Sequence, residues 1–423
     1  MKPMSGCTLI GASRALSGIQ DAVVLQHSVV GCHWGSLAAG MLQQSDDFLQ
    51  ASTVVYEENV IRGGTELIPQ GLTNIAELYP DVRTVFVVSG CIPNMIGDDM
   101  QSAVERWQEK HPDFRVLHIP APGYGGNEGE GMERAWLSLL DLIKLNGKNE
   151  ASAGEVAESA LNNNSADCIS GSLPKVNLLG ITASDPYSIN DLKYLRKVFE
   201  GKIEIVCALQ QCTTKDIARM GQADLNLVFG RGEKLAKAME EQFGIPYLIC
   251  EYPYGIQGMK SFFCELEQRV RADFSETVSR IDTEADRIVK RSAMYLTTLY
   301  QLPAAVTGDS AHLSGMKRFL EDELGMETVL ALDADTSDQN RLEERLQETH
   351  AVLLMGSSFE AALADKLSLP LVRYVYPVVD EVCLTDQPLL GPEGTAYLIQ
   401  QIVNAAMQMR YKTDGVYRGL REK

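Results

Sequence analysis

The chain has 423 residues, of which 45% are hydrophobic and 22% charged, and its formal net charge is −19. No apolar run approaches the roughly 20 residues of a membrane span, and no basic stripe is present to bind a phosphate backbone. The composition predicts a globular protein of roughly two to three domains and argues against membrane and nucleic-acid partners. The N-terminus lacks the pattern of a secretory signal, which favours the cytoplasm.

Residues 1–150 are predicted to form a first β/α domain. The runs "DAVVLQ", "TVFVVS" and "FRVLHIP" are typical of buried strands, and helical patterns separate them. Two of these helices, within "GGTELIPQGLTNIAELYP" and "IGDDMQSAVERWQEKHP", run into prolines that cannot continue a helix. Alternation of strands and helices predicts a parallel sheet.

The rest of the chain divides by composition. Residues 151–174 are small and polar and are predicted to be a linker or surface excursion. Residues 175–260 predict a second β/α domain, 261–302 a helical bridge without strands, and 303–423 a third β/α domain. The predicted fold class is therefore α/β, with three Rossmann-like parallel domains joined by helices.

Three of the nine cysteines follow a glycine: Cys7 in "MSGCTL", Cys32 in "VVGCHW" and Cys91 in "VVSGC". Glycine is 35 of 423 residues, so fewer than one such pair is expected by chance. Cys91 directly follows a predicted strand, and Cys32 follows the run "DAVVLQHSVVG". Ligand sites in parallel α/β sheets collect at the carboxyl ends of strands, which favours a shared site for the three thiols.

These cysteines lie too far apart in sequence for a local zinc motif, so the fold has to bring them together. We interpret Gly6, Gly31 and Gly90, which precede them, as positions where the backbone approaches a bulky group. An iron–sulfur cluster usually takes four cysteines. The fourth ligand would then be a different side chain, water or a residue of another chain, and we favour a cluster at a subunit interface.

Neighbouring residues supply further candidates. His33 follows Cys32 and is a candidate for tuning or shielding a cluster, although such a histidine is more often simply packed. Asp98 and Asp99 are expected to open a helix, with Asp98 as an alternative fourth ligand. After Cys91, "IPN" predicts a turn. The glycine-rich "GYGGNEGEG", residues 123–131, lacks the lysine of a phosphate loop and is expected to pass close to the cluster.

The other six cysteines are interpreted as ordinary thiols. Cys207, Cys250 and Cys264 fall on predicted apolar faces, where free cysteine is usually buried. Cys168, Cys212 and Cys383 have no matching partners in the sequence.

The stretches "CTLIGASRALSGIQDAVVLQHSVVGC", "VIRGGTELIPQGL" and "VVSGCIPNMIGDDM" resemble the opening of chains of the nitrogenase component 1 family. They are most similar to the β-type chain of the molybdenum-iron protein and to the scaffold chain that helps build its cofactor. The later "GIPYLICEYPYGIQG", "LMGSSFEAALADKLSLPLVRYVYPVVD" and "GPEGTAYLIQQIVNA" resemble the second and third domains of that family.

The resemblance implies a subunit of a two-component reductase. In this family, cysteines that match Cys7, Cys32 and Cys91 hold an interface cluster, either [4Fe-4S] or the eight-iron [8Fe-7S] P-cluster type. The implied partners are a second component 1-type chain, in a homodimer, heterodimer or heterotetramer, and an ATP-dependent iron–sulfur reductase that delivers electrons. The acidic surface is compatible with protein docking.

The sequence departs from the family at three places. Chains that hold the iron–molybdenum cofactor have a cysteine where Gly230 stands and a histidine where Leu389 and Leu390 stand. The resemblance therefore implies that this chain does not bind that cofactor. The β-type chain has a serine where Asn127 stands, which leaves the four-iron and eight-iron types open.

Three functions follow from these observations. The first is an electron-relaying subunit of a nitrogenase-like reductase, acting on a substrate or second cofactor. The second is a scaffold on which a metal cluster is assembled. The third is a tetrapyrrole reductase, which would need an apolar pocket between subunits.

Overall fold

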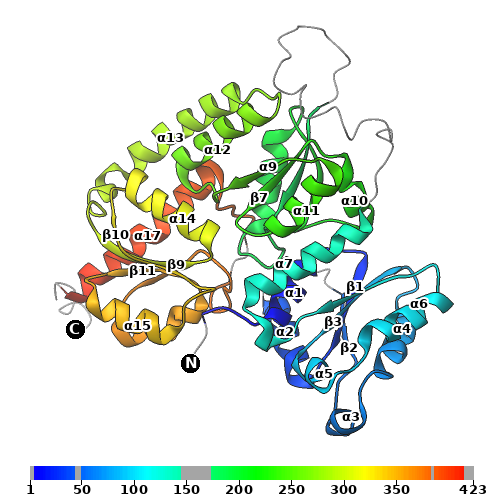
Figure 1. Cartoon of the computed structure of the whole chain (residues 1–423). Coiled ribbons are helices and arrows are strands. Elements are labelled where there is room, and N and C mark those ends of the chain that lie inside the picture. The colour runs from blue at the N-terminus through cyan, green and yellow to red at the C-terminus, as the bar shows by residue number, and fades with distance from the viewer. Residues whose placement is uncertain (1–3, 43–48, 144–172, 383–384, 414–423) are drawn as a thin grey trace, which may run out of the picture.

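Three parallel sheets of four strands each form the framework of the molecule (Figure 1). The structure, a computed structural model, describes residues 4–42, 49–143, 173–382 and 385–413. The strand orders are β2-β1-β3-β4, β6-β5-β7-β8 and β10-β9-β11-β12, so each sheet repeats the same topology. This arrangement confirms the predicted α/β class with three parallel β/α units.

The strands that form the three sheets are, in chain order, β1 (Ala22–His27), β2 (Leu49–Ser52), β3 (Thr84–Ser89), β4 (Arg115–Pro120), β5 (Lys175–Leu179), β6 (Glu204–Ala208), β7 (Leu225–Phe229), β8 (Tyr247–Cys250), β9 (Pro303–Gly308), β10 (Glu327–Asp333), β11 (Leu353–Gly356) and β12 (Leu371–Arg373). They fall within the ranges 1–150, 175–260 and 303–423. The domain bounds themselves stay predictions, and the predicted linker lies outside the described residues except for Leu173 and Pro174.

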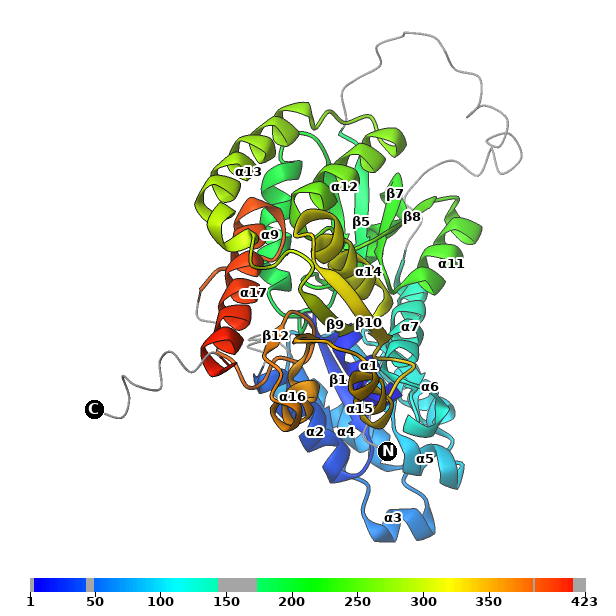
Figure 2. The same ribbon diagram turned by 90° about the vertical axis from the view of Figure 1, so that its left-hand side faces the viewer.

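Helices connect the strands and cover the sheets. The α-helices are α1 (Thr8–Leu16), α2 (Val30–Leu42), α3 (Glu57–Arg62), α4 (Leu67–Leu78), α5 (Cys91–Ile96), α6 (Met100–Lys110), α7 (Glu128–Ser138), α9 (Ser188–Phe199), α10 (Thr214–Arg219), α11 (Glu233–Phe243), α12 (Gly255–Arg269), α13 (Ser275–Leu296), α14 (Ser310–Arg318), α15 (Gln339–Glu348), α16 (Ala361–Leu367) and α17 (Gly391–Thr413). The bridge of α12 and α13 starts at Gly255, six residues before the predicted position, and α17 packs against both helices (Figure 2).

Strands β1 and β3 are buried along their whole length, which explains their continuous apolar sequences. Val23 and Val85 face a core beneath α4 and α6, whereas Val24 and Phe86 face a second core. That second core also contains Val228 of the second sheet. A third core joins the second and third sheets, so the three units are packed together through shared apolar interiors.

One short element of the first unit differs from the prediction. Residues 91–96 form helix α5 instead of the predicted turn "IPN". Pro93 is tolerated because it lies in the first turn of a helix, where its missing N–H has no partner to lose. Gly97 then ends α5 in the left-handed conformation, and Asp99 caps α6 by accepting from the Ser102 N–H at 3.2 Å.

Candidate metal centre at the edge of the first sheet

Each of the three cysteines that follow a glycine lies at the start of a helix. Cys7 is the N-cap of α1, Cys32 lies in the first turn of α2, and Cys91 is the first residue of α5. All three thiols are half-buried. β1 ends at His27, so Cys32 is carried by a helix and not by the strand end itself. The positive ends of these helices favour an anionic group beside the thiols.

Gly123 brings two of the thiols to one point. Its N–H donates to the Cys91 Sγ at 3.1 Å. A Cβ added to Gly123 would lie 3.2 Å from the Cys91 Sγ and 3.6 Å from the Cys7 Sγ, so both sulfur atoms face the same bare stretch of backbone. The Thr8 hydroxyl donates to the Pro122 carbonyl at 2.6 Å and fixes this turn beside α1.

Cys32 is held on the same side of the first unit. It packs against the apolar core that also supports Cys7, and its helix α2 contacts α1. Among the described residues, no three His, Cys, Asp or Glu side chains converge closely enough to hold a single metal ion. Ligands of an iron–sulfur cluster bind different iron atoms and are more widely spaced. Thiols at one bare backbone turn, with an N–H aimed at sulfur, therefore fit a cluster better than a single ion.

The glycines that precede the three cysteines were predicted to face a bulky group, but the structure shows other surroundings for them. A Cβ on Gly90 would lie 2.4 Å from the Ser28 Oγ, and one on Gly6 would lie 2.7 Å from the Glu128 Oε2. A Cβ on Gly31 would meet nothing within 4 Å. Buried oxygen atoms thus account for the absence of side chains at Gly6 and Gly90. Gly123, in the loop that was expected to pass near a cluster, is the glycine that faces the thiols.

The remaining candidates have identifiable structural partners. Asp98 accepts hydrogen bonds from the Gly64 N–H at 3.0 Å and the Thr65 hydroxyl at 3.2 Å, so we place it outside the ligand set. Asn127 caps α7, its side chain donates to the Asp335 carbonyl at 3.0 Å, and its backbone pairs with Cys7. His33 is half-buried, and burial lowers the pKa of its imidazole.

A row of hydrogen-bonded polar side chains runs from Asn94 on α5 to β3 and β4 and was not predicted. The Asn94 side chain donates to the Gly90 carbonyl at 2.7 Å and the Ser89 hydroxyl at 3.1 Å, and Ser89 in turn contacts the His118 Nε2 at 3.0 Å. Burial, with a contribution from His27, lowers the pKa of His118 to about 4. His27 and His118 are 91 residues apart, so no pattern in the sequence indicates that they interact.

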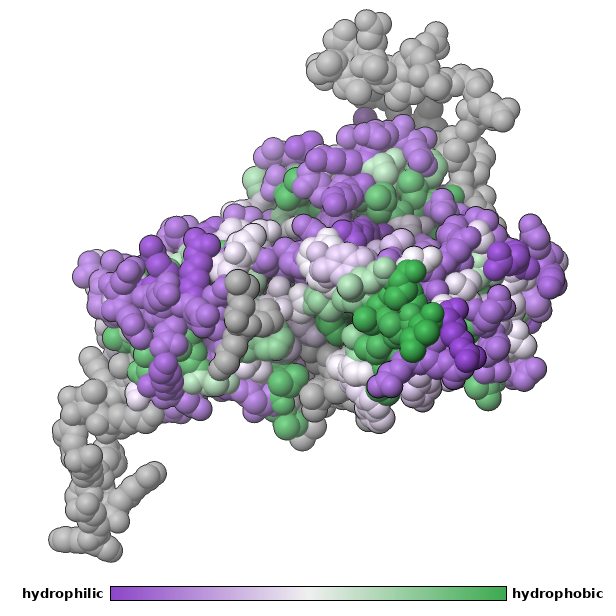
Figure 3. Space-filling view, turned by 60° about the horizontal axis from the view of Figure 1, so that its bottom comes forward, coloured by the Kyte–Doolittle hydropathy of each residue, from purple (hydrophilic) through white to green (hydrophobic). Residues whose placement is uncertain are grey.

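The thiols are surrounded by exposed apolar side chains, which we call the apolar rim. α2 and α5 carry some of them, Tyr124 adjoins Gly123, and the rest lie on or beside α3, which contacts α5. The rim comprises Val30, Trp34, Tyr56, Val60, Ile61, Met95, Ile96 and Tyr124. Figure 3 shows a continuous hydrophobic area on this face of the first unit. An apolar surface of this kind is typical of a protein interface.

A second candidate site, the junction of the three units, is filled by protein. A cavity of about 20 Å³ lies there, enough for one water molecule. Arg14 forms ion pairs with Glu128 and, at 2.6 Å, with Asp185, while Arg231 pairs with Asp335 at 2.6 Å. These pairs link α1 and α7 to the loops that follow β5, β7 and β10.

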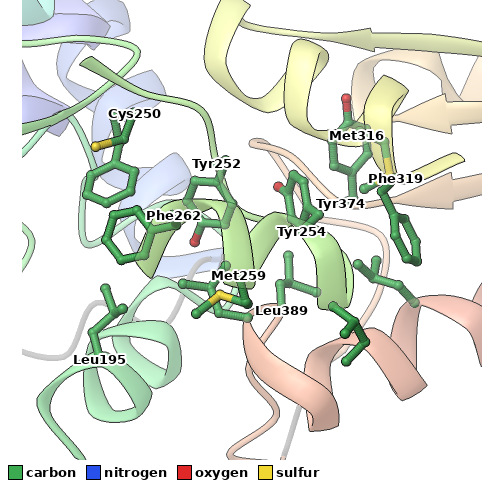
Figure 4. Close-up of a cluster of buried hydrophobic side chains, with 14 of the residues drawn as sticks. Leu195, Cys250, Tyr252, Tyr254, Met259, Phe262, Met316, Phe319, Tyr374 and Leu389 are labelled. Carbon is green, nitrogen blue, oxygen red and sulfur yellow. The ribbon is translucent and has the colours of Figure 1, made fainter. Parts of the chain in front are cut away.

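The junction also has no ligand at the positions where the family's cofactor-holding chains have them. A Cβ on Gly230 would lie 2.2 Å from the Ala311 Cβ, and the φ of +71° at Gly230 disfavours any other residue. Leu389 is buried in the core beside Met259 and Tyr254 (Figure 4). The N–H groups of Leu389 and Leu390 donate to Asp191. The residues at this junction do not fit the iron–molybdenum cofactor.

The other described cysteines are unlike the three at the edge. Cys207, Cys212 and Cys250 are buried, and burial raises the pKa of Cys250. A hydrogen bond with Cys207, followed by burial, raises the pKa of Cys212. Cys264 is exposed on α12, so its assignment to an apolar face was wrong. Cys168 and Cys383 lie outside the described residues.

Comparison with known families identifies the class of protein. The model of the nitrogenase component 1 type oxidoreductase family matches residues 7–334 and 333–407, so the chain belongs to that family. This confirms the resemblance seen in the sequence. No helix in the described ranges is both long and apolar enough to cross a membrane.

Individual relatives come from different branches. The chain is 31% identical to the nitrogenase iron-molybdenum cofactor biosynthesis protein NifE of Methanosarcina barkeri, covering 77% of this chain and 68% of that protein. It is 24% identical to the nitrogenase vanadium-iron protein beta chain of Trichormus variabilis, covering 98% and 96%. It is 23% identical to one of the subunits of the light-independent protochlorophyllide reductase of Nostoc punctiforme, covering 95% and 82%.

A solved structure supports the fold. A chain of nitrogenase Cp1 at pH 6.5 matches with a TM-score of 0.80 at 16% identity, covering 98% of this chain and 94% of that chain. At this identity the similarity establishes the three-unit architecture and not the activity.

Proposed function

We propose that this chain is a subunit of a nitrogenase-like two-component reductase and holds an iron–sulfur cluster through Cys7, Cys32 and Cys91 at an interface with another chain. Its role is to relay electrons from an ATP-dependent iron–sulfur reductase to a substrate or second cofactor. The observation that carries this proposal is the meeting of the Cys7 and Cys91 sulfurs at Gly123, inside the apolar rim.

The cluster, when bound, would accept and release single electrons. The chain's own residues determine how it is held. The three thiolates would bind iron, and the Gly123 N–H at 3.1 Å would stabilise negative charge on the Cys91 sulfur. Asn94 fixes the first turn of α5 and so positions the Cys91 side chain. A low-dielectric surrounding, formed once a partner covers the rim, strengthens these interactions.

The partner we propose is a second component 1-type chain that lies on the apolar rim. Trp34 and Ile61 are 62% and 85% exposed, and burying such side chains is the main source of interface energy. The partner would also supply the ligands that complete the set. A homodimer and a heteromeric complex both fit this proposal.

Cluster assembly is the second candidate function. The similarity to NifE, a cofactor biosynthesis protein, favours it. A scaffold would use the same thiols but would release the metal to an acceptor protein. Tetrapyrrole reduction, suggested by the similarity to light-independent protochlorophyllide reductase, would need a large apolar pocket. The 20 Å³ cavity at the junction is too small, so such a pocket would have to form at the rim.

The test is the metal content of the chain purified without oxygen. We expect iron, sulfide and a paramagnetic signal on reduction in the wild type, and loss of all three in Cys91→Ala. Cys264→Ala is the matched control, because Cys264 is an exposed thiol far from the site. Wild-type protein without iron, or equal iron loss in Cys264→Ala, would contradict the ligand assignment.

Two further measurements distinguish a reductase subunit from an assembly scaffold: electron transfer with turnover, and transfer of iron to an acceptor protein. Electron transfer from an ATP-dependent reductase with multiple turnovers supports a reductase subunit. Stoichiometric transfer of iron to an acceptor, without turnover, supports a scaffold.

A further inference from the structure

A fully buried imidazole lies at the carboxyl end of β1. His27 has no solvent exposure, and its Nδ1 contacts the Thr53 hydroxyl at 2.7 Å. Its other nitrogen, Nε2, is buried and has no hydrogen-bond partner. Leaving a buried polar atom unpaired costs free energy, so such an atom calls for an explanation.

The unpaired nitrogen faces a buried carboxylate. The His27 Nε2 lies 3.6 Å from the Asp98 Oδ2, and the Asp98 side chain is 4% exposed. At this distance the Asp98 carboxyl favours the charged form of the imidazole. Gly64 permits the approach, because a Cβ there would lie 3.0 Å from the Asp98 Oδ2 and 3.5 Å from the His27 Nε2.

His27 is joined directly to the backbone that carries Cys91. The His27 carbonyl accepts a hydrogen bond from the Gly90 N–H at 3.0 Å, and His27 is paired with Ser89 in the sheet. The main chain of His27 is therefore one hydrogen bond away from Gly90, the residue before the Cys91 ligand. His27 and Cys91 thus lie at the same ends of neighbouring strands, and charges in a protein interior interact more strongly than in water.

Two titratable groups interact with the His27 imidazole. Asp98 favours the charged imidazole, but burial outweighs it and lowers the pKa of His27. His118, on β4, interacts unfavourably with a charged His27. Thr53, on the segment after β2, and the Gly64 turn before α4 are uncharged neighbours. At neutral pH the His27 imidazole is thus an uncharged proton acceptor beside the Asp98 carboxyl.

We propose that the His27 imidazole takes up one proton when the centre at Cys91 gains an electron, forming a charged pair with Asp98. The inference rests on the proposed cluster at Cys91. The electron comes from the reductase, the proton comes from water, and the only bond formed is the N–H bond of His27. Added negative charge at the cluster stabilises the imidazolium, and the imidazolium stabilises the reduced cluster.

The readout is the dependence of the cluster's midpoint potential on pH. Coupling one proton to one electron makes the potential about 59 mV more negative for each tenfold fall in proton concentration. We expect this slope in the wild type within the range of about pH 5 to 8 in which imidazoles commonly titrate. The potential is measured by stepwise reduction with dithionite, followed by the paramagnetic signal.

His27→Gln is the first variant, because glutamine keeps a polar contact for Thr53 but does not titrate. We expect its potential to be independent of pH. The matched control is His350→Gln, which removes another histidine at a similar distance, 3.7 Å, from the carboxylate of Glu327 on the third sheet. This control should keep the wild-type slope, since neither group is near the thiols.

If His27→Gln loses iron, its potential cannot be measured, and Asp98→Asn is then the variant that tests the proposal. It keeps the imidazole and removes the counter-charge, so we expect the sloping region to move to lower pH. A wild-type potential without slope, in protein that contains iron, would overturn the inference and leave the proposed function intact. An unchanged slope in His27→Gln would also overturn it. Protein without iron at any pH contradicts the proposed function instead.

Discussion

The edge of the first sheet and the junction of the three units differ in how the fold fills them. At the edge, Cys7 and Cys91 face a backbone turn without side chains, and exposed apolar residues surround them. At the junction, Arg14 and Arg231 form buried ion pairs, and about 20 Å³ remains. The same architecture therefore offers two half-buried thiols beside a turn without side chains at one place and a closed interior at the other.

This difference explains how a member of a cofactor-binding family can lack a cofactor pocket. The ion pairs at the junction hold the three units together, which is a structural task. The metal centre that we propose lies at the edge, where the three thiols would need further ligands from a partner chain. Substitutions in one region that leave the other unchanged test whether stability and metal binding belong to different regions.

The largest effect is expected from breaking the junction. Arg231→Met leaves the Asp335 carboxyl, which is 16% exposed, without its closest ion-pair partner, and this costs roughly 3 kcal/mol, the lower end of the range for buried pairs. We expect a loss of that order in the free energy of unfolding, measured by urea titration of the anaerobic protein. Iron per folded chain should be unchanged. Iron loss without loss of stability would place the metal at the junction.

Gly123→Ala tests the edge. Its Cβ would lie 3.2 Å from the Cys91 Sγ, so the thiol has to move. We expect iron affinity to fall by about tenfold, as for other changes next to metal ligands, with little change in stability. The matched control is Gly31→Ala, which also adjoins a ligand but whose Cβ meets nothing within 4 Å. Chelator competition measures both variants, and equal affinities would contradict the role of Gly123.

The last prediction concerns a change of stability with pH at the contact between the second and third units. Burial raises the pKa of Asp191 to about 7, while the unfolded carboxyl titrates near 3.8. Between these values the folded state binds the extra proton, so this group's stabilisation is complete below about pH 4 and is lost as pH rises to about 7. Relative to Asp191→Asn, wild-type stability should fall by about 1.4 kcal/mol per pH unit in this interval.

Urea titrations of both proteins at several pH values measure this difference. A wild-type stability that rises relative to Asp191→Asn over the same interval would show that the carboxyl is ionised in the folded protein. Iron content should not change with the substitution, because Asp191 lies away from the thiols, against Leu389 and Tyr252.

The sequence was sufficient for the fold because the signals were continuous. β1 and β3 are buried on both faces, so their apolar runs were recognisable, and the alternation with helices indicated parallel sheets. β2 (Leu49–Ser52) was missed because it is a short, half-buried edge strand without a clear pattern. Helix α5 was missed because Pro93 was interpreted as part of a turn, although proline fits the first helical turn.

The site was only partly predictable. Glycine-cysteine pairs identified three candidate thiols, but the reason given for Gly90 was wrong in detail, since Ser28 occupies the space beside it. The ion pair between Arg14 and Glu128 spans 114 residues, and the contact between His27 and Asp98 spans 71. Such contacts leave no local pattern, because only the folded sheets bring their partners together.

An anomalous-scattering map at the iron absorption edge, from anaerobic crystals of the chain with its partner, tests the central claim most directly. It should show iron beside Gly123, within bonding distance of the Cys7 and Cys91 sulfurs, and none between Arg14 and Arg231. Iron at the junction of the three units, or no iron beside Gly123, would contradict the assignment.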